Sequence, residues 1–530
     1  MASTAFCLAK LVLTVSRVLL KQYYRIPKGL HRNFSNAHAS QGQFQKSHSL
    51  AQRSELSDHT LIFNVEGALL KSSSTFPYFM LVAFEAGSII RAFFLFILYP
   101  FLCLLSQELS LKIMIMVCFF GIKKESFRVG TAVLPKFFLE GVGAEGFEVL
   151  RKGGRKVGVS DLPRVMVESF LKDYLEIDFV VGRELKVCCG YYVGLMEEKT
   201  SIDDHLEEIF DQDEKMCCDL IGISSSNKSE IYLVNEEDKS KWHLLARDRY
   251  PKPLIFHDGR LAFRPPLLNM LAMFMWFPVG SILSITRVIV AISLPYNAAI
   301  PILIFTGVQL KLSKPKYFHS ISKPKPIKKH KGLLYVWNHR TLLDPVFLSF
   351  GLKKPFAAVT YSLSRMSELL SPIRTVRLTR DRDQDAKMID NFNLLNQGDL
   401  VVCPEGKTCR EPYLLRFSPL FSELSDEIVP VGMDTRVSMF HGTTAGGLKF
   451  LDPFFFLMNP CPAYTVRFLD MVHDASRCRR GGATSSFEVA NYVQRELGKA
   501  LGFECTSLTR RDKYLILAGN EGIASGTGNR

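Results

Sequence analysis

The amino-acid sequence predicts an α/β protein made of two α/β domains, with a hydrophobic insertion in the first domain and a hydrophobic hairpin between the two. Its 530 residues are too many for a single hydrophobic core. Short apolar runs bounded by glycine or proline alternate with helical patterns in both halves of the chain. Hydrophobic residues make up 47% of the chain and charged residues 22%, a balance typical of globular domains joined to membrane-embedded segments.

Charge and cysteine content narrow the function classes. The net charge is +14, but no basic stripe interleaved with aromatic residues and no nucleic-acid-binding motif is present, so nucleic acid is not a predicted partner. Anionic lipid and phosphorylated ligands fit the charge better. The 12 cysteines include no C-x-x-C pair, and no histidine cluster has zinc spacing. The sequence therefore predicts a reduced, cytosol-facing protein without a metal site.

Residues 1–55 form a basic N-terminal segment with no acidic residue before Glu55. Such a composition is typical of an organelle transit peptide. It is equally typical of a basic amphipathic segment on a membrane surface, and Lys10 and Arg17 interrupt the apolar run too early for a clean membrane span. The residues leave both interpretations open.

Residues 56–265 are predicted to form the first domain. The run TLIFNVEGALL at 60–70 has the pattern of a buried strand entering a turn at Gly67. A helix is expected over 163–175, with strands over 177–185 and 230–234. About residues 76–122 a hydrophobic insertion follows the first strand, with Glu85 and Arg91 inside it. Such charges face a protein interior or lie near an interface, which favours a hairpin or re-entrant pair over two simple spans.

Residues 266–310 are predicted to form a membrane hairpin, and residues 311–331 a polybasic linker. No acidic residue occurs from Gly259 to Leu343, while lysines recur throughout the linker. Lysines just outside a membrane segment mark the cytosolic side and favour anionic headgroups. A solvated linker explains them equally well, and the two interpretations are compatible.

Residues 332–530 are predicted to form the second α/β domain, with a mainly parallel sheet, because strand-like runs alternate with helical segments. The predicted strands cover residues 332–338, 355–362, 399–406, 427–433 and 464–470.

The sequence NHRTLLDP at 338–345 places His339 and Asp344 at the end of the first of these strands. A turn into a helix can bring the carboxylate back to the imidazole. The carboxylate would then fix the tautomer and leave the other ring nitrogen free as a base, an arrangement that speeds a reaction by roughly 100- to 10,000-fold. Taken alone, the pair could equally serve helix capping.

Four ordered blocks in the second domain give the pair its context: NHRTLLDP, IRTVRLTRDR at 373–382, VCPEGKTCREPYLLRFSPLF at 402–421, and IVPVGM at 428–433. With these blocks the sequence resembles the land-plant membrane-bound glycerol-3-phosphate acyltransferases associated with cutin and suberin. The resemblance extends upstream through residues 60–70 and 253–262 and downstream through 503–520. It implies a C-terminal glycerolipid acyltransferase domain and a first domain like the haloacid-dehalogenase (HAD) phosphatases.

The resemblance also implies a function and a set of site residues. His339 would remove a proton from a hydroxyl of glycerol 3-phosphate as that hydroxyl attacks acyl-CoA, and Asp344 would orient His339. The resemblance implies the sn-2 position. No cofactor is needed besides the acyl-CoA substrate, and the product would be lysophosphatidic acid. Family positions that bind the acceptor phosphate or shape its pocket correspond to Arg380, Glu405, Gly406 and Arg410. Pro430 would belong to the acyl-donor site.

Lys407 departs from the family pattern, which has threonine at this position. A second cation beside Arg410 would tighten phosphate binding or disturb its geometry, and the alternative is a lysine that points to solvent.

The first domain has lost the phosphatase signature. Asn64 stands where the HAD phosphatases have their nucleophilic aspartate, and a neutral amide cannot form an aspartyl-phosphate. Glu66 replaces the second aspartate, and its extra methylene misplaces a Mg²⁺ ligand. Ser160 corresponds to the second motif, but residues 220–227 lack the acidic metal site. The prediction is a domain without phosphatase activity.

Several alternatives stay open at this point. The same His-Asp pair could acylate another acceptor, such as lysophosphatidate, or the chain could be a catalytically idle lipid-binding scaffold. The hydrophobic pairs and the resemblance favour an integral membrane protein of the endoplasmic reticulum with its catalytic domain in the cytosol. The acid-free N-terminus keeps a mitochondrial membrane open.

Overall fold

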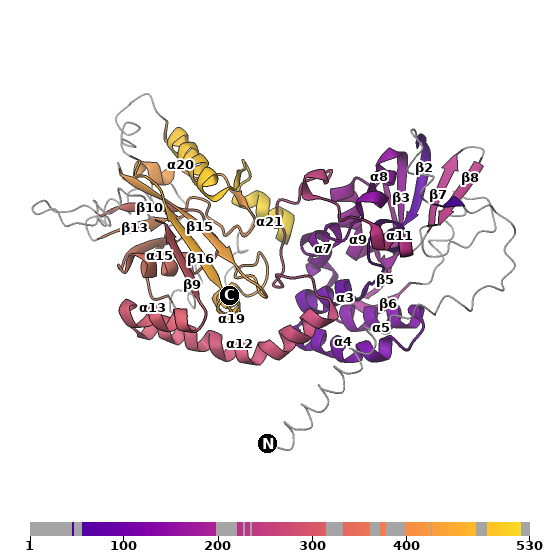
Figure 1. Ribbon diagram of the computed structural model, residues 1–530, viewed down its shortest axis with the longest axis horizontal. Helices are drawn as coiled ribbons and strands as arrows, with labels where there is room; N and C mark the ends of the chain where they lie inside the picture. Colours follow the sequence, from indigo (N-terminus) through magenta and orange to yellow (C-terminus); the bar gives the residue numbers. More distant parts are fainter. Residues whose placement is uncertain are drawn as a thin grey trace, which may run out of the picture. The chain divides into compact units, whose positions relative to one another are not determined.

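The computed structural model describes residues 45–46, 56–197, 220–225, 228–233, 236–313, 332–360, 371–377, 398–425, 427–472 and 485–520 (Figure 1). The chain divides into two compact units, the first formed by residues 1–130 and 134–253 and the second by residues 131–133 and 254–530. The division after residue 253 precedes the domain boundary suggested at residue 265. Apart from β1 (Gln45–Lys46), the basic segment 1–55 lies outside the described residues.

The first unit is built on a six-stranded sheet in the order β1-β8-β7-β2-β3-β4. Its strands besides β1 are β2 (Leu56–Asn64), β3 (Gly153–Pro163), β4 (Phe179–Arg183), β7 (Leu220–Ser225) and β8 (Lys228–Leu233). β2, β3 and β4 are parallel, while β7 runs antiparallel to β2. The expected buried strand is confirmed: β2 buries residues 61–63 and ends at Asn64, where the π-helical turn η1 (Val65–Leu69) begins.

Helices and a hairpin surround this sheet. The remaining elements of the unit are α6 (Val129–Ala132), α7 (Leu134–Leu139), α8 (Ala144–Lys152), α9 (Arg164–Ser169), η4 (Phe170–Tyr174), α11 (Glu236–Lys241), the turns η3 (Lys124–Ser126) and η5 (Arg247–Arg249), and the hairpin β5 (Leu185–Cys188) with β6 (Tyr191–Met196). The helix expected over 163–175 is confirmed as α9 and η4.

The predicted hydrophobic insertion folds as a group of short helices: α3 (Phe76–Val82), η2 (Ala83–Gly87), α4 (Ile89–Leu102) and α5 (Gln107–Phe119). At 1.5 Å per residue α4 is about 21 Å long, less than the roughly 30 Å hydrocarbon core of a bilayer. Arg91 donates to the carbonyls of Cys118 (2.8 Å) and Phe120 (2.9 Å) at the end of α5, where a cation is favoured. The charge inside this segment therefore joins two helices, as expected of a hairpin.

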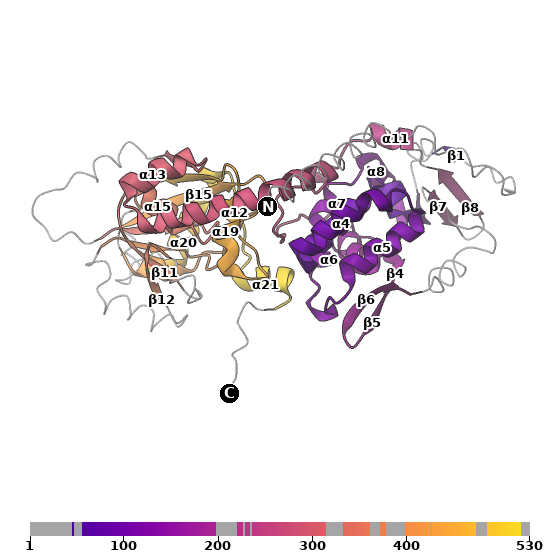
Figure 2. The ribbon, with the colours of Figure 1, turned by 90° about the horizontal axis from the view of Figure 1, so that it is seen from below.

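The second unit is built on a seven-stranded sheet in the order β12-β11-β13-β10-β15-β16-β9 (Figures 1 and 2). Its strands are β9 (Gln309–Ser313), β10 (Leu334–Trp337), β11 (Ala357–Thr360), β12 (Arg374–Arg377), β13 (Leu400–Val402), β15 (Ile428–Arg436) and β16 (Ala463–Phe468). All pairings are parallel except that between β15 and β16. The five expected strands and the mainly parallel sheet are confirmed.

Helices cover both faces of this sheet, and β10 shows why. Leu334 and Val336 pack toward α20 (Ser486–Leu501), while Tyr335 and Trp337 pack toward α15 (Asp344–Leu352) and α19 (Asp452–Met458). Successive strand residues point to opposite faces, so a strand buried on both sides is apolar throughout. The remaining elements are α21 (Arg510–Ala518), the turns η6 (Pro419–Glu423) and η7 (Lys449–Leu451), and the small pair β14 (Tyr413–Leu414) and β17 (Glu504–Cys505).

The predicted membrane hairpin consists of α12 (Leu267–Ser293) and α13 (Tyr296–Phe305). Among the described residues, one helix, α12, is long and apolar enough to cross a membrane. One of its faces packs against α19, and the fully buried Arg287 there donates to the carbonyls of Leu457 (2.5 Å) and Asn459 (2.7 Å). Since the chain then continues into β9 at the sheet edge, the hairpin folds as part of the second unit.

Candidate active site

Two of the sequence blocks lie at the carboxyl ends of neighbouring parallel strands in the middle of the sheet. β10 ends directly before the block 338–345, and β13 ends directly before residues 403–411. From β10 the chain builds β11 to β13 on one side and β15 and β16 on the other. Open α/β sheets bind ligands at such a change of direction, outside the carboxyl ends of the strands. The fold therefore brings both blocks to the expected ligand site.

His339 and Asp344 form the expected pair. His339 Nδ1 lies 2.8 Å from Asp344 Oδ2. A carboxylate can only accept a hydrogen bond, so Nδ1 carries the proton and Nε2 is the acceptor nitrogen. The His339 side chain is 18% exposed, whereas that of Asp344 is fully buried. Within the described part of the chain Nε2 has no hydrogen-bond partner, which leaves it open to a substrate.

Asp344 is held by donors on all sides. Its Oδ2 also accepts from the backbone N–H of Arg340 (2.6 Å), and its Oδ1 accepts from the N–H of Thr341 (2.9 Å) and the hydroxyl of Tyr464 (2.7 Å). Tyr464 comes from β16, on the far side of β15. Because a buried carboxylate needs such donors, they fix the orientation of Asp344.

Glu405 supports the backbone of His339. Its carboxylate accepts from the N–H of His339 (2.7 Å) and from that of Leu415 (3.0 Å). Burial raises the pKa of Glu405 to about 8, against the opposing effect of these hydrogen bonds and of the nearby Arg340 charge. Glu405 therefore joins the block that contains His339 to the block 402–421, and it shapes the site by holding the backbone of His339 in place.

Arg340 is a positioning residue that the sequence alone did not assign. Its guanidinium donates to the carbonyls of Cys409 (2.7 Å), Arg410 (2.7 Å) and Glu411 (2.6 Å), and to Asp434 (3.1 Å). Five N–H donors in a rigid fork suit this role. The residue next to His339 thus holds three consecutive carbonyls of the neighbouring block. Its position beside the histidine was the only sequence signal for it.

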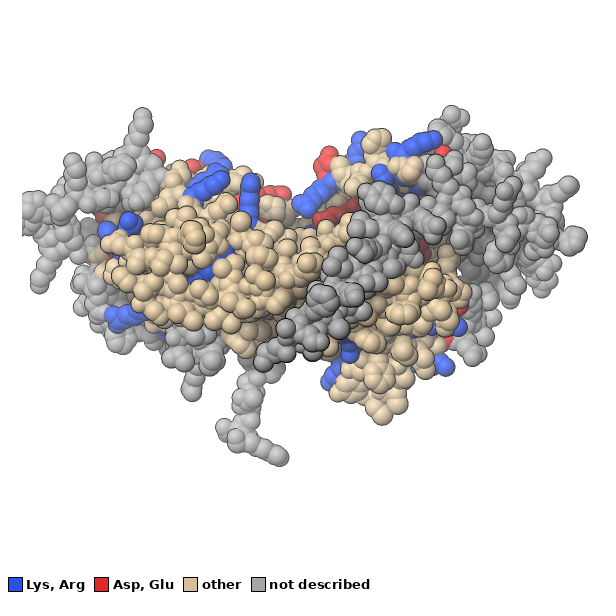
Figure 3. All heavy atoms as spheres, turned by 60° about the horizontal axis from the view of Figure 1, so that its bottom comes forward, with Lys and Arg blue, Asp and Glu red and all other residues tan. Residues whose placement is uncertain are grey.

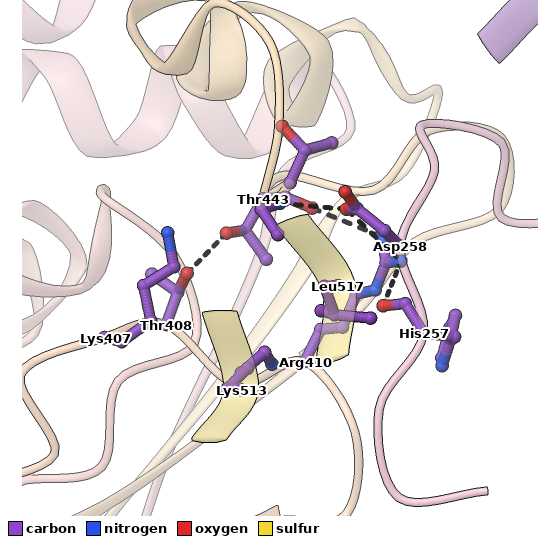
Figure 4. Close-up of a pocket in the computed structure, with 10 residues that line it drawn as sticks. His257, Asp258, Lys407, Thr408, Arg410, Thr443, Lys513 and Leu517 are labelled. Atoms are coloured by element: carbon purple, nitrogen blue, oxygen red, sulfur yellow. Dashed lines mark hydrogen bonds and ion pairs between the residues drawn. The ribbon is translucent and has the colours of Figure 1, made fainter. Parts of the chain in front are cut away.

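Arg410, predicted to bind phosphate or shape its pocket, donates to backbone carbonyls. Its partners are Gly259 (2.6 Å), His257 (2.6 Å) and Thr443 (3.2 Å). It fastens the segment 257–259, which precedes α12, to the wall of a pocket that also includes Lys407, Thr408 and Lys513 (Figure 4). The observed geometry supports the pocket-shaping part of the expectation.

Lys407 does not point to solvent, so that alternative is wrong. The residue is 9% exposed, and its Nζ donates to Tyr514 Oη at 2.6 Å while lying 4.3 Å from the ring centroid. Burial, together with the neighbouring Lys449 and Lys513 charges, lowers the pKa of Lys407 to about 6. Tyr514 belongs to α21, more than a hundred residues downstream, and the sequence analysis did not connect the two.

The remaining predicted residues divide into three cases. Gly406 has φ +65°, a left-handed conformation that suits glycine and turns the loop toward Lys407. Pro430 is buried in β15 opposite Val336, and its place in the acyl-donor site stays a prediction. Arg380 lies outside the described residues, so its role also stays a prediction.

Family models match both units of the chain. One described as "Glycerol-3-phosphate acyltransferase RAM2-like, HAD-like domain" matches residues 60–238, and an acyltransferase model matches residues 319–434. The chain is 55% identical to the probable glycerol-3-phosphate acyltransferase 3 of Arabidopsis thaliana, over 96% of this chain and 98% of the relative. The chain belongs to the plant glycerol-3-phosphate acyltransferase family.

Two further relatives support this assignment to the glycerol-3-phosphate acyltransferases. The probable glycerol-3-phosphate acyltransferase 2 of Arabidopsis thaliana is 56% identical, with 91% of this chain and 93% of the relative covered. Glycerol-3-phosphate acyltransferase RAM2 of Petunia hybrida is 42% identical, with 87% and 97% covered. The family and the arrangement of a HAD-like domain followed by an acyltransferase domain, both implied by the resemblance, are confirmed. The acyltransferase match ends at residue 434, before the pocket residues 443–445 and 513–517.

The HAD-like unit of this glycerol-3-phosphate acyltransferase assembles the altered phosphatase positions around the end of β2. The Asn64 side chain accepts from the N–H of Gly67 (2.6 Å) and so caps η1. Ser160 donates to Glu66, and Lys239, which the sequence analysis missed, donates to the Glu66 carbonyl (3.1 Å). Burial raises the pKa of Glu66 to about 7. A carboxyl held in this way is a poor ligand for a divalent cation.

In the segment compared with the acidic phosphatase motif, the serines lie away from Asn64. β7 runs antiparallel to β2, with Ser224 opposite Thr60 and Ile221 opposite Phe63. Residues 224–225 therefore lie toward the amino end of β2, away from Asn64. Within the described ranges no group of three or more histidine, cysteine, aspartate or glutamate side chains could hold a metal ion.

Proposed function

We propose that this chain transfers an acyl group from acyl-CoA to a hydroxyl of glycerol 3-phosphate, at sn-2 as the resemblance implies, and releases lysophosphatidic acid and CoA. The observation that carries the proposal is the His339–Asp344 pair at the carboxyl end of β10, with Nδ1 bound to the buried carboxylate and Nε2 open. The names of the relatives supply the acceptor, and the pocket lined by Lys407, Arg410 and Lys513 supports a phosphorylated one.

The mechanism follows from the direction of these hydrogen bonds. His339 Nε2 accepts the proton of the acceptor hydroxyl as its oxygen attacks the thioester carbonyl. The fixed negative charge of Asp344 stabilises the imidazolium that forms. When the tetrahedral intermediate collapses, the C–S bond breaks, and the imidazolium returns the proton to the CoA thiolate. The histidine ends the cycle neutral, and no acyl-enzyme forms.

Acyl transfer by microsomes that express the protein tests this function. Labelled acyl-CoA is supplied with glycerol 3-phosphate or with lysophosphatidate, and the acylated position and the phosphate content of the product are read by mass spectrometry. The proposal expects glycerol 3-phosphate to have the higher kcat/KM and the acyl group to appear at sn-2. A preference for lysophosphatidate would assign the same pair to a different acceptor, and transfer to neither would favour the idle scaffold.

We expect no phosphatase activity from the first unit. Purified protein with Mg²⁺ should release no inorganic phosphate from lysophosphatidic acid above a heat-denatured control, because Asn64 cannot be phosphorylated. Asn64→Asp should leave phosphate release at this background, since Glu66 is held by Ser160 and a buried carboxyl of raised pKa is a poor metal ligand. Phosphate release by either form, measured colorimetrically, would contradict the proposal.

We propose that α12 and α13 attach the catalytic unit to the cytosolic face of the endoplasmic reticulum membrane. The face of α12 opposite α19 is apolar and exposed, and Figure 3 shows few charges on the surface over these helices. Its exposed large hydrophobic residues are Leu268, Met275, Val279, Ile282, Ile285, Ile289 and Ile292. In-plane attachment along this face suits a helix whose other face is packed on the protein.

Replacing Ile282 and Ile289 together by aspartate is expected to lower binding to phospholipid vesicles at least about tenfold. Burying one isoleucine contributes about 1.5–3 kcal/mol, and a charge at its place adds a penalty. Flotation of protein synthesised in the presence of vesicles measures this. Tyr492→Asp is the matched control, because Tyr492 is 45% exposed on α20, on the other side of the sheet (Figure 1). Equal flotation of both variants would exclude α12 as the membrane contact.

A separate experiment tests the compartment. The location of a fluorescent fusion is compared with and without residues 1–54.

A further inference from the structure

Helix α21 brings two lysine side chains together beside the pocket described above, and one of them, Lys407, lines the pocket. Lys407 and Lys449 both donate through Nζ to Tyr514 Oη, and Lys449 lies 4.9 Å from the Tyr514 ring centroid. We name Lys407, Lys449 and Tyr514 the Tyr514 cluster. The capping box of Thr509 and Asp512 defines where α21 begins, and this sets the direction in which Tyr514 points.

We propose that the Tyr514 cluster binds the phosphate of the acyl acceptor. This inference rests on the proposed function and assigns the phosphate to Lys407 and Lys449. Arg410 acts as a positioning residue for the pocket wall.

The pocket has the composition of an anion site. It is partly open to solvent and is walled by four segments that are distant in the sequence (Figure 4). Thr408 and Thr443 line it with hydroxyls 2.5 Å apart. Ammonium groups and hydroxyl donors around one small space suit a phosphate.

The cations of the Tyr514 cluster lack the counter-charge that their neighbours have. Lys513 pairs with Glu411 (2.9 Å), and Arg260 pairs with Asp452 (2.8 Å). Across the described part of the chain, neither Lys407 nor Lys449 has a carboxylate within ion-pair distance. Two lysine amines therefore meet at one neutral hydroxyl, and a bound anion would stabilise them in their charged forms.

The loop that carries Lys407 is hydrogen-bonded to the backbone of the catalytic residue. The Glu405 carboxylate accepts from the N–H of His339, and Lys407 lies two residues after Glu405 in the chain. The N–H of Cys409 donates to the His339 carbonyl at 2.7 Å. The loop that carries Lys407 is thus hydrogen-bonded on both sides of the residue to the backbone of His339. A phosphate held by Lys407 would be fixed relative to the imidazole that takes the hydroxyl proton.

The guanidinium of Arg410 is less available to a phosphate than the amines of Lys407 and Lys449. Its guanidinium donates to three backbone carbonyls, those of His257, Gly259 and Thr443. A phosphate contact would require breaking some of these hydrogen bonds, each of which satisfies a carbonyl near the pocket.

Binding of a dianion should also change the protonation of Lys407. In the empty pocket, burial and neighbouring cations lower the pKa of Lys407 to about 6, so at pH 8 the amine is mostly neutral. An anion within hydrogen-bond distance favours the ammonium form. The charged groups around the amine are Lys449, Lys513, Asp452, Arg410, Asp258 and Glu411. Binding near pH 8, where glycerol 3-phosphate is already a dianion, should take up close to one proton.

Steady-state kinetics of Lys407→Gln and Lys449→Gln test the proposal. Each is expected to raise KM for glycerol 3-phosphate about 10- to 100-fold, the effect of losing one charge-assisted hydrogen bond, with KM for acyl-CoA unchanged. Transfer to glycerol, which lacks the phosphate, should fall much less in the variants than transfer to glycerol 3-phosphate. Lys449 is exposed, so Lys449→Gln does not disturb packing. Lys499→Gln, which removes an exposed lysine of α20 paired with Glu496, is the matched control.

Calorimetry of glycerol 3-phosphate binding at pH 8, in two buffers of different ionisation enthalpy, adds a readout that a structural role would not move. Wild type should take up a proton and Lys407→Gln should not. A raised KM for acyl-CoA with an unchanged KM for glycerol 3-phosphate would assign the cluster to a phosphate of CoA and overturn the proposal. Unchanged constants for both substrates would also overturn it while the proposed function stands. If wild type transfers no acyl group but calorimetry shows the coupled binding, the proposed function fails and the phosphate site remains.

Discussion

Replacing His339 by alanine is expected to lower the rate of acyl transfer to glycerol 3-phosphate by about 100- to 10,000-fold. The imidazole is the group at the carboxyl end of β10 whose Nε2 can take the hydroxyl proton, because its Nδ1 is committed to Asp344 at 2.8 Å. The measurement is the initial rate with labelled acyl-CoA in microsomes that contain equal amounts of wild type and variant. KM for glycerol 3-phosphate should change little, since His339 acts on the hydroxyl and the phosphate is held elsewhere.

His339→Ala is a clean substitution because it removes little packing. The side chain is partly exposed, and its hydrogen-bond partner, Asp344, keeps three other donors: the N–H groups of Arg340 and Thr341 and the hydroxyl of Tyr464. The thermal denaturation midpoint should therefore stay within a few degrees of wild type. Asp344→Asn should lose activity to a similar degree, because an amide cannot accept from all the donors that surround Asp344. Retention of more than a tenth of wild-type activity in His339→Ala would remove the general base from the mechanism.

The contact between His339 and Asp344 was predictable from the sequence because its geometry is local. His339 and Asp344 are five residues apart across one strand-to-helix turn, and such a turn has few conformations. The strands of the sheet were predictable for a similar reason, since β10 and β15 are short apolar runs that a sheet buried on both faces requires. The altered phosphatase positions were also visible, because Asn64 and Glu66 lie within one strand end.

The phosphate pocket was not predictable in the same way because its contacts are long-range. Lys407 and Tyr514 are 107 positions apart, and Lys513 and Glu411 are 102 apart. Charge patterns carry no information about which distant helix will meet a loop, so Lys407 in solvent was a reasonable alternative. Arg340 illustrates the same limit: its role depends on the carbonyls of Cys409, Arg410 and Glu411, which the sequence does not place beside it.

Replacing Lys513 by methionine is expected to destabilise the second unit by about 3–5 kcal/mol, because it leaves the Glu411 carboxylate buried without its ammonium partner. Both side chains are almost completely buried, at 4% and 2% exposure, and lie 2.9 Å apart. Since a domain is stable by only about 5–15 kcal/mol, the variant should lose most of its margin. Thermal denaturation of the purified, detergent-solubilised protein measures the loss. Lys499→Met, at an exposed ion pair with Glu496, is the control and should cost less than about 1 kcal/mol.

The double variant Glu411→Gln with Lys513→Met separates a buried charge from lost packing. It should be more stable than Lys513→Met alone, because no unpaired charge remains, while glutamine keeps an oxygen for the N–H of His257 (2.9 Å). If both variants lost the same stability, packing and not charge would explain the effect.

The pair should also set the acid limit of stability. Burial alone would raise the pKa of Glu411, but Lys513, Arg410 and the hydrogen bonds to the carboxylate outweigh it and lower the pKa to about 2. A carboxyl whose pKa is lower in the folded state than its unfolded value of 4.5 stabilises the fold fully above about pH 4.5 and loses this contribution as the pH falls toward 2. Lys513 has a raised pKa, so its contribution is complete below its unfolded value of 10.5. The denaturation midpoint of wild type should therefore fall between pH 4.5 and 2 more steeply than that of the double variant, which lacks the titrating carboxyl. If the denaturation midpoints of the two proteins fell in parallel with pH, other carboxylates would set the acid limit. The contact between Lys513 and Glu411 would then contribute packing and no pH-dependent stability.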